Sequence, residues 1–236
     1  MKIAILSDIH GNFIALKEVL KQIEKNDINR LFVLGDQLGY YYQAEEVYKS
    51  LESYNCDIIS GNHEKLFLKF INSDQSFKKE ITDKYGKCFN FYSETFPDHL
   101  YKKIKSLKDE LVISINNINF LICHGSPKIS ERYIYPDENK SQINDIDGID
   151  FIFNGHTHYP MIYNGKNSTL INVGSVGQSR VAGGIANWGI FDTENSVYSP
   201  KSTIFDIEKV IVNLHDHNEE KKYLFDILKR NNYNYE

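Results

Sequence analysis

Five short apolar runs along this chain each stop at a side chain that can bind a metal ion. The runs and their following motifs are Lys2–Leu6 with Ser7-Asp8-Ile9-His10, Leu31–Leu34 with Gly35-Asp36, Asp57–Ile59 with Gly61-Asn62-His63, Asn119–Cys123 with His124-Gly125, and Asp150–Phe153 with Gly155-His156-Thr157-His158. Parallel strands are buried on both faces and read as continuous apolar runs, and ligands collect beyond their carboxyl ends. We therefore predict that two Asp, one Asn and five His lie along one rim of one sheet. A dinuclear metal centre explains this recurrence better than five coincidences.

Net charge and the lengths of apolar runs bear on whether the chain binds nucleic acid or a membrane. With a net charge of -5 over 236 residues, the chain lacks the basic excess that binding of long nucleic acid usually requires. No apolar run approaches the roughly 18 residues of a membrane span. The four apolar residues after Lys2 are too few for a signal-peptide core of about 7–15 residues. We therefore expect a cytoplasmic protein without membrane contact. Cys56, Cys88 and Cys123 are odd in number and widely spaced, which predicts reduced thiols.

The first part of the chain reads as strand, helix, strand, helix, strand. Five apolar side chains recur at helical spacing after Asn12, which suits the N-cap position; they are Phe13, Leu16, Val19, Leu20 and Ile23. A second helix is predicted over Ala44–Ser53. Residues 63–109 are polar, aromatic and helical in pattern. We interpret residues 63–109 as a helical cap inserted between the third and fourth motifs.

The second half of the chain is rich in short strands. A hairpin is predicted from Leu111–Ile115 to Ile118–Cys123 through Asn116-Asn117. Further strands are predicted at Met161–Tyr163, Thr169–Val173, Asn187–Asp192 and Lys201–Asp206, and two helices near Ile207–Leu214 and Glu219–Arg230 form a C-terminal pair at about residues 207–230. This order predicts an α/β fold of two stacked sheets with helices on both outsides. We see no internal boundary, so residues 1–236 are predicted to form a single domain.

The side chains that follow the strands suit a particular class of metal ion. Asp8 and His10 are two residues apart, as are His156 and His158, so on extended backbone each pair points to one side. Carboxylate, imidazole and amide ligands favour Mn²⁺, Fe²⁺, Ni²⁺ or Zn²⁺ over Ca²⁺ or Mg²⁺. Two ions need a bridging carboxylate, and Asp36 stands between the two groups of ligands in the chain.

A pair of such ions can activate a bridging water for in-line displacement at phosphorus. His63 directly follows Asn62 and is expected to face away from it, toward the substrate. We therefore regard His63 as the candidate general acid.

Taken together, the five motifs resemble those of the calcineurin-like metallophosphoesterase superfamily. The motifs that carry the resemblance are Asp8-x-His10, Gly35-Asp36-x-x-Gly39, Gly61-Asn62-His63-Glu64, His124-Gly125 and Gly155-His156-Thr157-His158, within residues 2 to about 180. Further segments resemble the small prokaryotic phosphodiesterase-like branch, namely Gly39-Tyr40, His124-Gly125-Ser126-Pro127, Gly174–Gln178 with Arg180, and the paired C-terminal helices.

The resemblance implies a four-layer α/β/β/α sandwich of two stacked mixed sheets. It also implies two divalent ions, with Mn²⁺ first and Fe, Ni²⁺ or Zn²⁺ as alternatives, and a nucleophilic hydroxide bridging them. One ion would bind Asp8, His10, Asp36 and His158, and the other Asp36, Asn62, His124 and His156. His63 would contact the scissile phosphate, which makes His63 and Asp36 the catalytic candidates.

Some positions depart from related families and bear on the substrate. Ser/Thr protein phosphatases of the superfamily carry Asp-Arg where this chain has Gly39-Tyr40 and lack the second His that His158 supplies, so a protein phosphatase is disfavoured. Asn62, His63, Arg180 and Tyr40 are the candidate substrate-binding residues. Tyr41-Tyr42 and Ser179 replace residues typical of the branch and are expected to border the substrate mouth.

Two further expectations concern the packing of the three tyrosines and the shape of the Gly-rich loop. Tyr40, Tyr41 and Tyr42 either stack on a base or pack the cap, and we favour packing. Ser175 and Gln178 are expected to shape the Gly-rich loop through backbone contacts.

We therefore predict a metal-dependent phosphodiesterase that acts on a small phosphoester, a nucleotide being one option. A phosphomonoesterase or a dinucleoside polyphosphate hydrolase is the alternative among enzymes, because metal pairs serve either bond. A non-catalytic scaffold, like the metallophosphoesterase-like subunit of the retromer coat, is the alternative of another class. No metal ligand is missing and His63 is present, which disfavours the scaffold. The sequence is compatible with an oligomer and leaves the native metal open.

Overall fold

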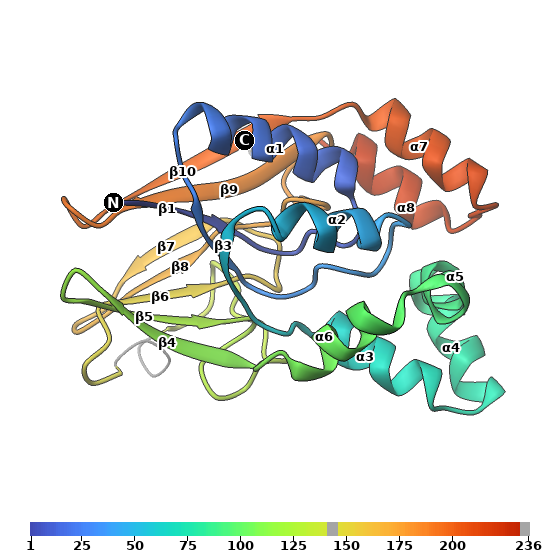
Figure 1. Ribbon diagram of the computed structural model, residues 1–236, viewed down its shortest axis with the longest axis horizontal. Coiled ribbons are helices and arrows are strands. Elements are labelled where there is room, and N and C mark those ends of the chain that lie inside the picture. The colour runs from blue at the N-terminus through green and yellow to red at the C-terminus, as the bar shows by residue number, and fades with distance from the viewer. Residues whose placement is uncertain (141–145, 232–236) are drawn as a thin grey trace.

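Two mixed five-stranded sheets stack face to face at the centre of the molecule (Figure 1). The structure is a computed structural model that describes residues 1–140 and 146–231. The first sheet has the order β10-β9-β1-β2-β3, with β1 at Lys2–Leu6, β2 at Arg30–Val33, β3 at Asn55–Ile58, β9 at Ile185–Asp192 and β10 at Val197–Ile204. The second has the order β4-β5-β6-β8-β7, with β4 at Glu110–Ile115, β5 at Ile118–Cys123, β6 at Phe151–Asn154, β7 at Met161–Asn164 and β8 at Thr169–Asn172. The predicted α/β fold of two stacked mixed sheets flanked by helices is confirmed.

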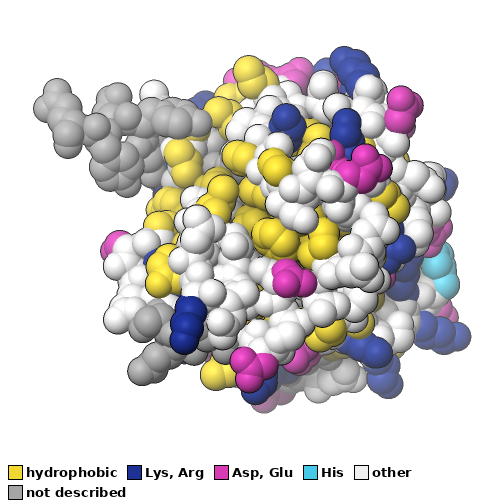
Figure 2. Space-filling view, turned by 90° about the vertical axis from the view of Figure 1, so that its left-hand side faces the viewer, with side chains coloured by type: hydrophobic (Ala, Val, Ile, Leu, Met, Phe, Trp, Pro, Cys, Tyr) yellow, Lys and Arg dark blue, Asp and Glu magenta, His cyan; other side chains and the backbone are white. Residues whose placement is uncertain are grey.

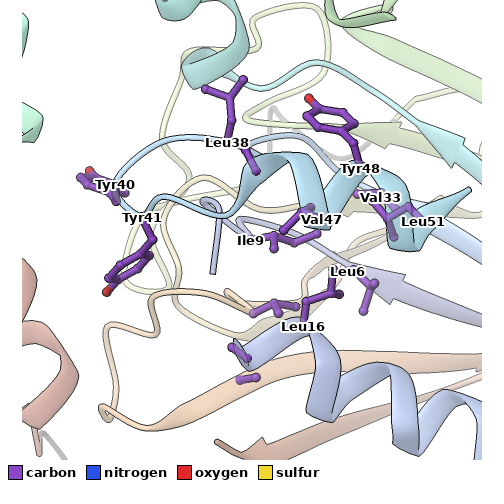
Figure 3. Packing of buried hydrophobic residues seen from close by; sticks show 14 of the residues in the cluster. Leu6, Ile9, Leu16, Val33, Leu38, Tyr40, Tyr41, Val47, Tyr48 and Leu51 are labelled. Atoms are coloured by element: carbon purple, nitrogen blue, oxygen red, sulfur yellow. The ribbon is translucent and has the colours of Figure 1, made fainter. Parts of the chain in front are cut away.

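The apolar runs of the first sheet are continuous because its central strands are covered on both faces. Strands β1, β2 and β3 run parallel, and β9 lies antiparallel to β1. Ala4 and Leu6 of β1 face the core beneath the helices, whereas Ile3 and Ile5 face the core between the two sheets. Figure 3 shows Leu6 in the first of these cores, between the strands and helices α1 and α2. Alternate residues of one strand therefore build two different cores.

The helices lie in two groups (Figure 1). On the outer side of the first sheet are α1 at Phe13–Lys25, α2 at Ala44–Leu51, α7 at Ile207–Asp216 and α8 at Lys222–Asp226, followed by a 3-10 turn at Ile227–Lys229. The helical cap consists of α3 at Asn62–Ile71, α4 at Gln75–Tyr85, α5 at Cys88–Thr95 and α6 at Asp98–Ser106. The cap extends beyond the carboxyl ends of β1, β2 and β3. The outer face of the second sheet is packed by Ile134 and Ile149 from the segment between β5 and β6.

Most predicted elements are present, with shifts at their ends. Asn12 caps α1, since its side-chain oxygen accepts the N–H of Ala15 at 3.0 Å. The hairpin of β4 and β5 turns through Asn116 and Asn117, both of which have positive φ. The last predicted helix is much shorter than expected. Glu219 explains this, because its carboxylate accepts the N–H groups of the two residues that follow it and holds a turn there.

The five motifs lie at one end of two sheets, so the prediction of one rim of one sheet is wrong. The first three follow β1, β2 and β3 of the first sheet, and the last two follow β5 and β6 of the second. The physical reason is the hairpin of β4 and β5, which begins a separate sheet. Parallel strands β5, β6 and β8 of that sheet end on the same side as β1 and β2. The two carboxyl edges therefore face each other across the stack.

The cysteines, the helix lengths and one face of the molecule add further findings. All three cysteines are free thiols. Among the described residues, no helix has the length and apolar character needed to cross a membrane. Figure 2 shows the end of the molecule opposite the helical cap, where Lys and Arg side chains are scattered among Asp and Glu around hydrophobic side chains.

Candidate metal centre

The ligand residues sit on left-handed backbone where the strands end. Five predicted ligands have positive φ, namely Asp8 at 53°, His10 at 55°, Asp36 at 55°, His156 at 67° and His158 at 61°. The expectation of extended backbone at the two Asp/His and His/His pairs is therefore wrong, because the chain turns sharply at each of these residues. Such conformations are uncommon for residues other than glycine, and they cluster at functional sites.

The first group of ligands is formed by Asp8, His10 and His158, all fully buried or nearly so. Asp8 Oδ1 lies 3.2 Å from His158 Nε2 and 3.7 Å from His10 Nε2. Asp8 Oδ2 instead accepts the hydroxyl of Ser7 at 2.6 Å and the N–H of His156 at 3.0 Å. Among the described residues, Asp8 Oδ1 has no hydrogen-bond donor. One oxygen of Asp8 is thus fixed by the protein and the other faces the two imidazoles.

The second group is formed by Asp36, His124 and His156, with Asn62 beside them. Asp36 Oδ2 lies 3.3 Å from His124 Nε2 and 3.8 Å from His10 Nε2 of the first group. Asn62 Oδ1 is 3.0 Å from His124 Nε2. Asp36 therefore lies between the two groups, as a bridging carboxylate must.

Each of the four imidazoles turns one ring nitrogen to a backbone carbonyl oxygen. The pairs are His10 Nδ1 with Leu38 O at 3.4 Å, His124 Nδ1 with Leu34 O at 2.7 Å, His158 Nδ1 with Gln178 O at 2.7 Å, and His156 Nε2 with Glu131 O at 3.2 Å. A carbonyl oxygen can only accept, so these nitrogens carry a hydrogen, and in the neutral form of each ring the opposite nitrogen keeps its lone pair.

These lone pairs converge in a way that fits a bound cation. Nε2 of His10 and Nε2 of His158 lie 3.1 Å apart, with no hydrogen available between them in this tautomer. Ligand atoms that each lie about 2.0–2.2 Å from one divalent ion are separated by roughly this distance. The donor set of buried carboxylates and imidazoles is therefore suited to divalent metals.

Charge in the centre follows from burial and from the close neighbours. Burial by itself would raise the pKa values of Asp8 and Asp36, but the adjacent histidines hold both pKa values below their usual range. Burial lowers the pKa of His156 to about 4. At His124 burial also lowers the pKa, but the carboxylate of Asp36 outweighs it and raises the pKa to about 10.

Glu64 organises the backbone around the bridging carboxylate. Glu64 Oε2 accepts the N–H groups of Asp36 and Gly61, both at 2.8 Å. Its Oε1 accepts those of Gln37 at 2.8 Å and Leu38 at 3.2 Å. Burial and the charge of Asp36 raise the pKa of Glu64, whereas the N–H donors favour its charged form. The sequence analysis gave Glu64 no role, although its position three residues after Gly61 has the spacing of a capping box.

Two motif glycines are required by close approach to ligands. A Cβ on Gly155 would lie 2.3 Å from Asp8 Oδ2 and 1.9 Å from Ser7 Oγ. A Cβ on Gly61 would lie 2.1 Å from Asp36 Oδ1. Any side chain at these positions would displace a carboxylate of the centre.

His63 lies on the cap side of the centre and is only 3% exposed. Its ring contacts those of His10, Tyr40 and Tyr85, with centroid separations of 4.7, 4.8 and 5.1 Å. Its backbone N–H donates to Asp36 Oδ1 at 2.8 Å. Burial lowers the pKa of His63. His63 lies outside the groups that hold Asp8 and His124, but it forms a third group of potential ligands with His10 and Asp36.

The predicted substrate-binding residues are near the centre, whereas the side chains of the expected mouth residues are buried. Tyr40 contacts His10 and His63, and the half-buried Arg180 interacts electrostatically with the Tyr40 hydroxyl. Tyr41 and Tyr42 are buried, which confirms the packing prediction.

The expectation that Tyr41, Tyr42 and Ser179 border the substrate mouth is wrong. Tyr41 and Tyr42 belong to the core around the helices, and the Tyr42 hydroxyl donates to Glu219. Ser179 is only 4% exposed, and its hydroxyl oxygen accepts from the Asn187 amide.

The expectation that the Gly-rich loop acts through backbone contacts holds for Gln178, whereas Ser175 acts through its side-chain hydroxyl. Ser175 Oγ donates to the carbonyl of Asp8 at 2.8 Å, and the carbonyl of Gln178 accepts from His158 Nδ1. The loop thus supports both ends of the first ligand group.

A cavity of about 340 Å³ opens beside the second ligand group. It is lined by Asn62, Lys65, Leu66, Lys69, Tyr85, Glu131, Tyr133 and His156. Five of these polar and aromatic residues were missed by the sequence analysis. Lys65 and Lys69 could have been found from the sequence, because their spacing on a helix that begins at Asn62 places them on the same helix face as Asn62. Tyr133 and Glu131 lie in an irregular segment, where periodicity gives no information.

Comparisons with known proteins agree with this geometry. The family model described as the calcineurin-like phosphoesterase superfamily domain matches residues 1–196. An uncharacterized protein of Methanocaldococcus jannaschii is 30% identical over 226 residues, covering 88% of this chain and 89% of that protein.

Two solved prokaryotic structures share the fold over almost their full lengths. A hypothetical protein of Pyrococcus horikoshii has a TM-score of 0.85 at 19% identity, covering 97% of this chain and 98% of its own. A metallophosphoesterase of Sphaerobacter thermophilus has a TM-score of 0.78 at 20% identity, with the same coverage. The predicted likeness to small prokaryotic members is therefore confirmed.

Proposed function

The chain belongs to the calcineurin-like phosphoesterase superfamily, and from that membership we propose that it is a metal-dependent phosphodiesterase acting on small phosphoesters. Its metal ligands in this proposal are Asp8, His10, Asp36, Asn62, His124, His156 and His158, and its substrate-binding residues are Asn62, His63, Arg180 and Tyr40. We further propose one domain over residues 1–236, because both ligand groups draw on both sheets or on their shared edge.

The observation that carries the proposal is the facing pair of imidazole lone pairs beside Asp8 Oδ1. Two like partial charges 3.1 Å apart, with an unpartnered carboxylate oxygen next to them, are unfavourable unless a cation lies between. The bridging position of Asp36 extends the same argument to a second ion.

Two bound divalent ions would lower the pKa of water and neutralise the phosphate oxygens. The protein's own residues would then do the rest. Asn62 and Arg180 hold the phosphate, and Asp36 keeps the two ligand groups in register. A hydroxide, formed from water by loss of a proton to solvent, would form the new bond to phosphorus through its oxygen as the opposite bond to the leaving oxygen breaks.

His63 would give its proton to that leaving oxygen and later regain one from solvent. Burial lowers the pKa of His63, so its protonated form needs an anion nearby, and a bound phosphate supplies one. Tyr40 packs against the ring and limits its orientation.

The experiment is hydrolysis of bis-(p-nitrophenyl) phosphate by protein loaded with Mn²⁺, Fe²⁺, Ni²⁺ or Zn²⁺. Asp36→Asn and His63→Ala are expected to abolish turnover, and His99→Ala, an exposed histidine of α6, serves as the control. Turnover in both variants comparable to that of the parent protein would refute the proposal. Metal analysis of each variant separates lost binding, expected for Asp36→Asn, from lost proton transfer.

The same assay decides between the alternatives. A faster rate on p-nitrophenyl phosphate would indicate a phosphomonoesterase. Absence of both bound metal and hydrolysis across the metal panel would favour the non-catalytic scaffold.

A further inference from the structure

The cavity beside the second ligand group concentrates positive charge on an acidic protein. The chain carries a net charge of -5, yet two lysines and one glutamate line this cavity. Its inner wall is formed by Asn62 and His156 of the metal centre. The cavity is therefore continuous with the place where a phosphate would bind.

The lysines lie on the same face of α3 as the metal-centre residue that begins the helix. Asn62, Lys65, Leu66 and Lys69 occupy positions i, i+3, i+4 and i+7, which form one stripe along a helix. Seven residues of helix rise about 10 Å. Lys69 thus stands well beyond a phosphate held at Asn62, and it is placed to meet a different part of the substrate.

The two lysines differ in how far their charge is already neutralised. Lys65 Nζ lies 2.8 Å from Asp109 Oδ2 and donates to Ser130 Oγ at 2.6 Å. Lys69 forms no ion pair with any carboxylate in residues 1–140 and 146–231, and its ammonium group lies 4.4 Å from the centroid of the Phe77 ring. Lys69 therefore keeps a charge that can bind an anion.

The other walls suit a sugar and a base. Leu66 and Tyr85 contribute apolar and aromatic surface. Tyr133 is stacked on His156 with ring centroids 3.8 Å apart and planes at 17°. Both rings line the cavity, so the stacked pair adds aromatic surface to its wall.

We propose that this cavity binds the part of the substrate beyond the scissile bond and selects nucleotides that carry a second phosphate, which Lys69 holds. The proposal rests on the proposed phosphodiesterase function, because the first phosphate is taken to lie at the metal centre. The second phosphate could be attached through a sugar or through a pyrophosphate link, and both present the same anionic group to Lys69.

The test compares the protein with Lys69→Ala on substrates that differ by one phosphate. The dinucleotides d(ApA) and pd(ApA) form the sugar-linked pair, diadenosine tetraphosphate is the pyrophosphate-linked substrate, and bis-(p-nitrophenyl) phosphate lacks a second phosphate. We expect kcat/KM to fall about ten-fold on pd(ApA), on diadenosine tetraphosphate, or on both. On the other two substrates it should change less than about two-fold. Lys69→Arg should restore most of the loss.

Lys78→Ala is the matched control. Lys78 of α4 lies 5.6 Å from the centroid of the Phe70 ring, so like Lys69 it packs over a phenylalanine of the neighbouring cap helix. It does not line the cavity. A loss in Lys78→Ala equal to that in Lys69→Ala would overturn the proposal, because it would mean that cap packing rather than charge at the cavity is responsible.

A binding experiment separates failure of this inference from failure of the proposed function. In calorimetric titrations, adenosine 3′,5′-bisphosphate should bind about ten-fold more tightly than adenosine 5′-monophosphate, and Lys69→Ala should remove the difference. If the parent protein and Lys69→Ala prefer the bisphosphate over the monophosphate equally, the subsite is overturned whether or not any substrate is hydrolysed. If Lys69→Ala loses the preference for the bisphosphate and the parent protein hydrolyses no substrate, the subsite is supported and the phosphodiesterase is refuted.

Discussion

At the scale of single residues, the centre depends on side chains that are not among the proposed ligands or substrate-binding residues. Glu64 accepts four backbone N–H groups and thereby joins the loop after β2 to the start of α3. Asp36 and Asn62 are carried by those two segments. The relative position of two proposed ligands is thus set by one buried carboxylate.

Replacing Glu64 by Gln should destabilise the protein by about 2–4 kcal/mol, because the amide NH₂ would oppose N–H donors that are buried. Urea unfolding of Glu64→Gln measures this loss, with the exposed Glu80→Gln as the control. A change within about 0.5 kcal/mol, as for an ordinary surface position, would contradict the role given to Glu64.

Replacing Gly155 by Ala should weaken metal affinity about 10–100-fold, the range typical for groups that orient ligands. The added Cβ would fall 2.3 Å from Asp8 Oδ2 and must displace it. His99→Ala is the control, because His99 is exposed on α6 and is not among the proposed ligands. Calorimetric titration with Mn²⁺ provides the comparison, and equal affinities in the two variants would show that Asp8 is not a ligand.

At the scale of elements, the C-terminal helices hold the cap in place. Glu219, between α7 and α8, accepts the Tyr42 hydroxyl at 2.6 Å and the Lys87 N–H at 2.7 Å. Lys87 lies two residues after Tyr85, whose ring contacts His63. The C-terminal pair therefore stabilises the cap segment that packs on the candidate general acid.

Stability should depend on pH through Glu219. Burial alone would raise its pKa, but hydrogen bonds from Tyr42 and from the Lys87 N–H outweigh burial and lower the pKa. A lowered pKa in the folded state means that the stabilisation is present above the ordinary Glu pKa of about 4.3 and is lost as the pH falls through the lower folded-state value.

Between about pH 5 and about pH 3, the unfolding free energy of the parent protein should therefore fall more steeply than that of Glu219→Gln. Tyr42→Phe, which removes one donor, should give an intermediate slope. Parallel curves for all three proteins would rule out the contribution of Glu219.

Elements with a strong local pattern could be predicted from the sequence, and elements defined by contacts could not. The apolar runs of β1 and β2 and the helical spacing after Asn12 depend on residues that are close in the sequence. A single segment is therefore enough to predict them. The division of the motifs between two sheets depends on how the hairpin of β4 and β5 packs, which no segment encodes alone. Likewise, the clustering of Asp8, Asp36 and the motif histidines could be predicted because they follow strand ends, whereas Tyr133 reaches His156 only through the path of an irregular segment.

At the scale of the whole molecule, metal binding should couple to global stability. Ligands come from strand ends that are distant in the sequence, and the unfolded chain has no preformed site, so binding free energy adds to folding free energy. At a free metal concentration 100 times Kd, the gain is about 2.7 kcal/mol. For a chain of this size that corresponds to a Tm increase of roughly 5–10 °C.

Differential scanning calorimetry with Mn²⁺ and with a chelator tests this coupling. The increase should be much smaller in Asp36→Asn, which loses the bridging carboxylate, and smaller with Ca²⁺ than with Mn²⁺. A Tm that is the same with metal and with chelator would exclude a metal centre that spans the two sheets.

The division of the proposed ligands between two sheets also determines when, during synthesis and folding, the metal-binding groups can form. On a ribosome the first sheet cannot be complete early, because β1 lies between β2 and β9, and β9 is synthesised after every ligand strand. His156 and His158 reach Asp8 only when the second sheet has docked on the first. Metal binding by the proposed ligands of both sheets would therefore have to follow translation of both halves of the chain.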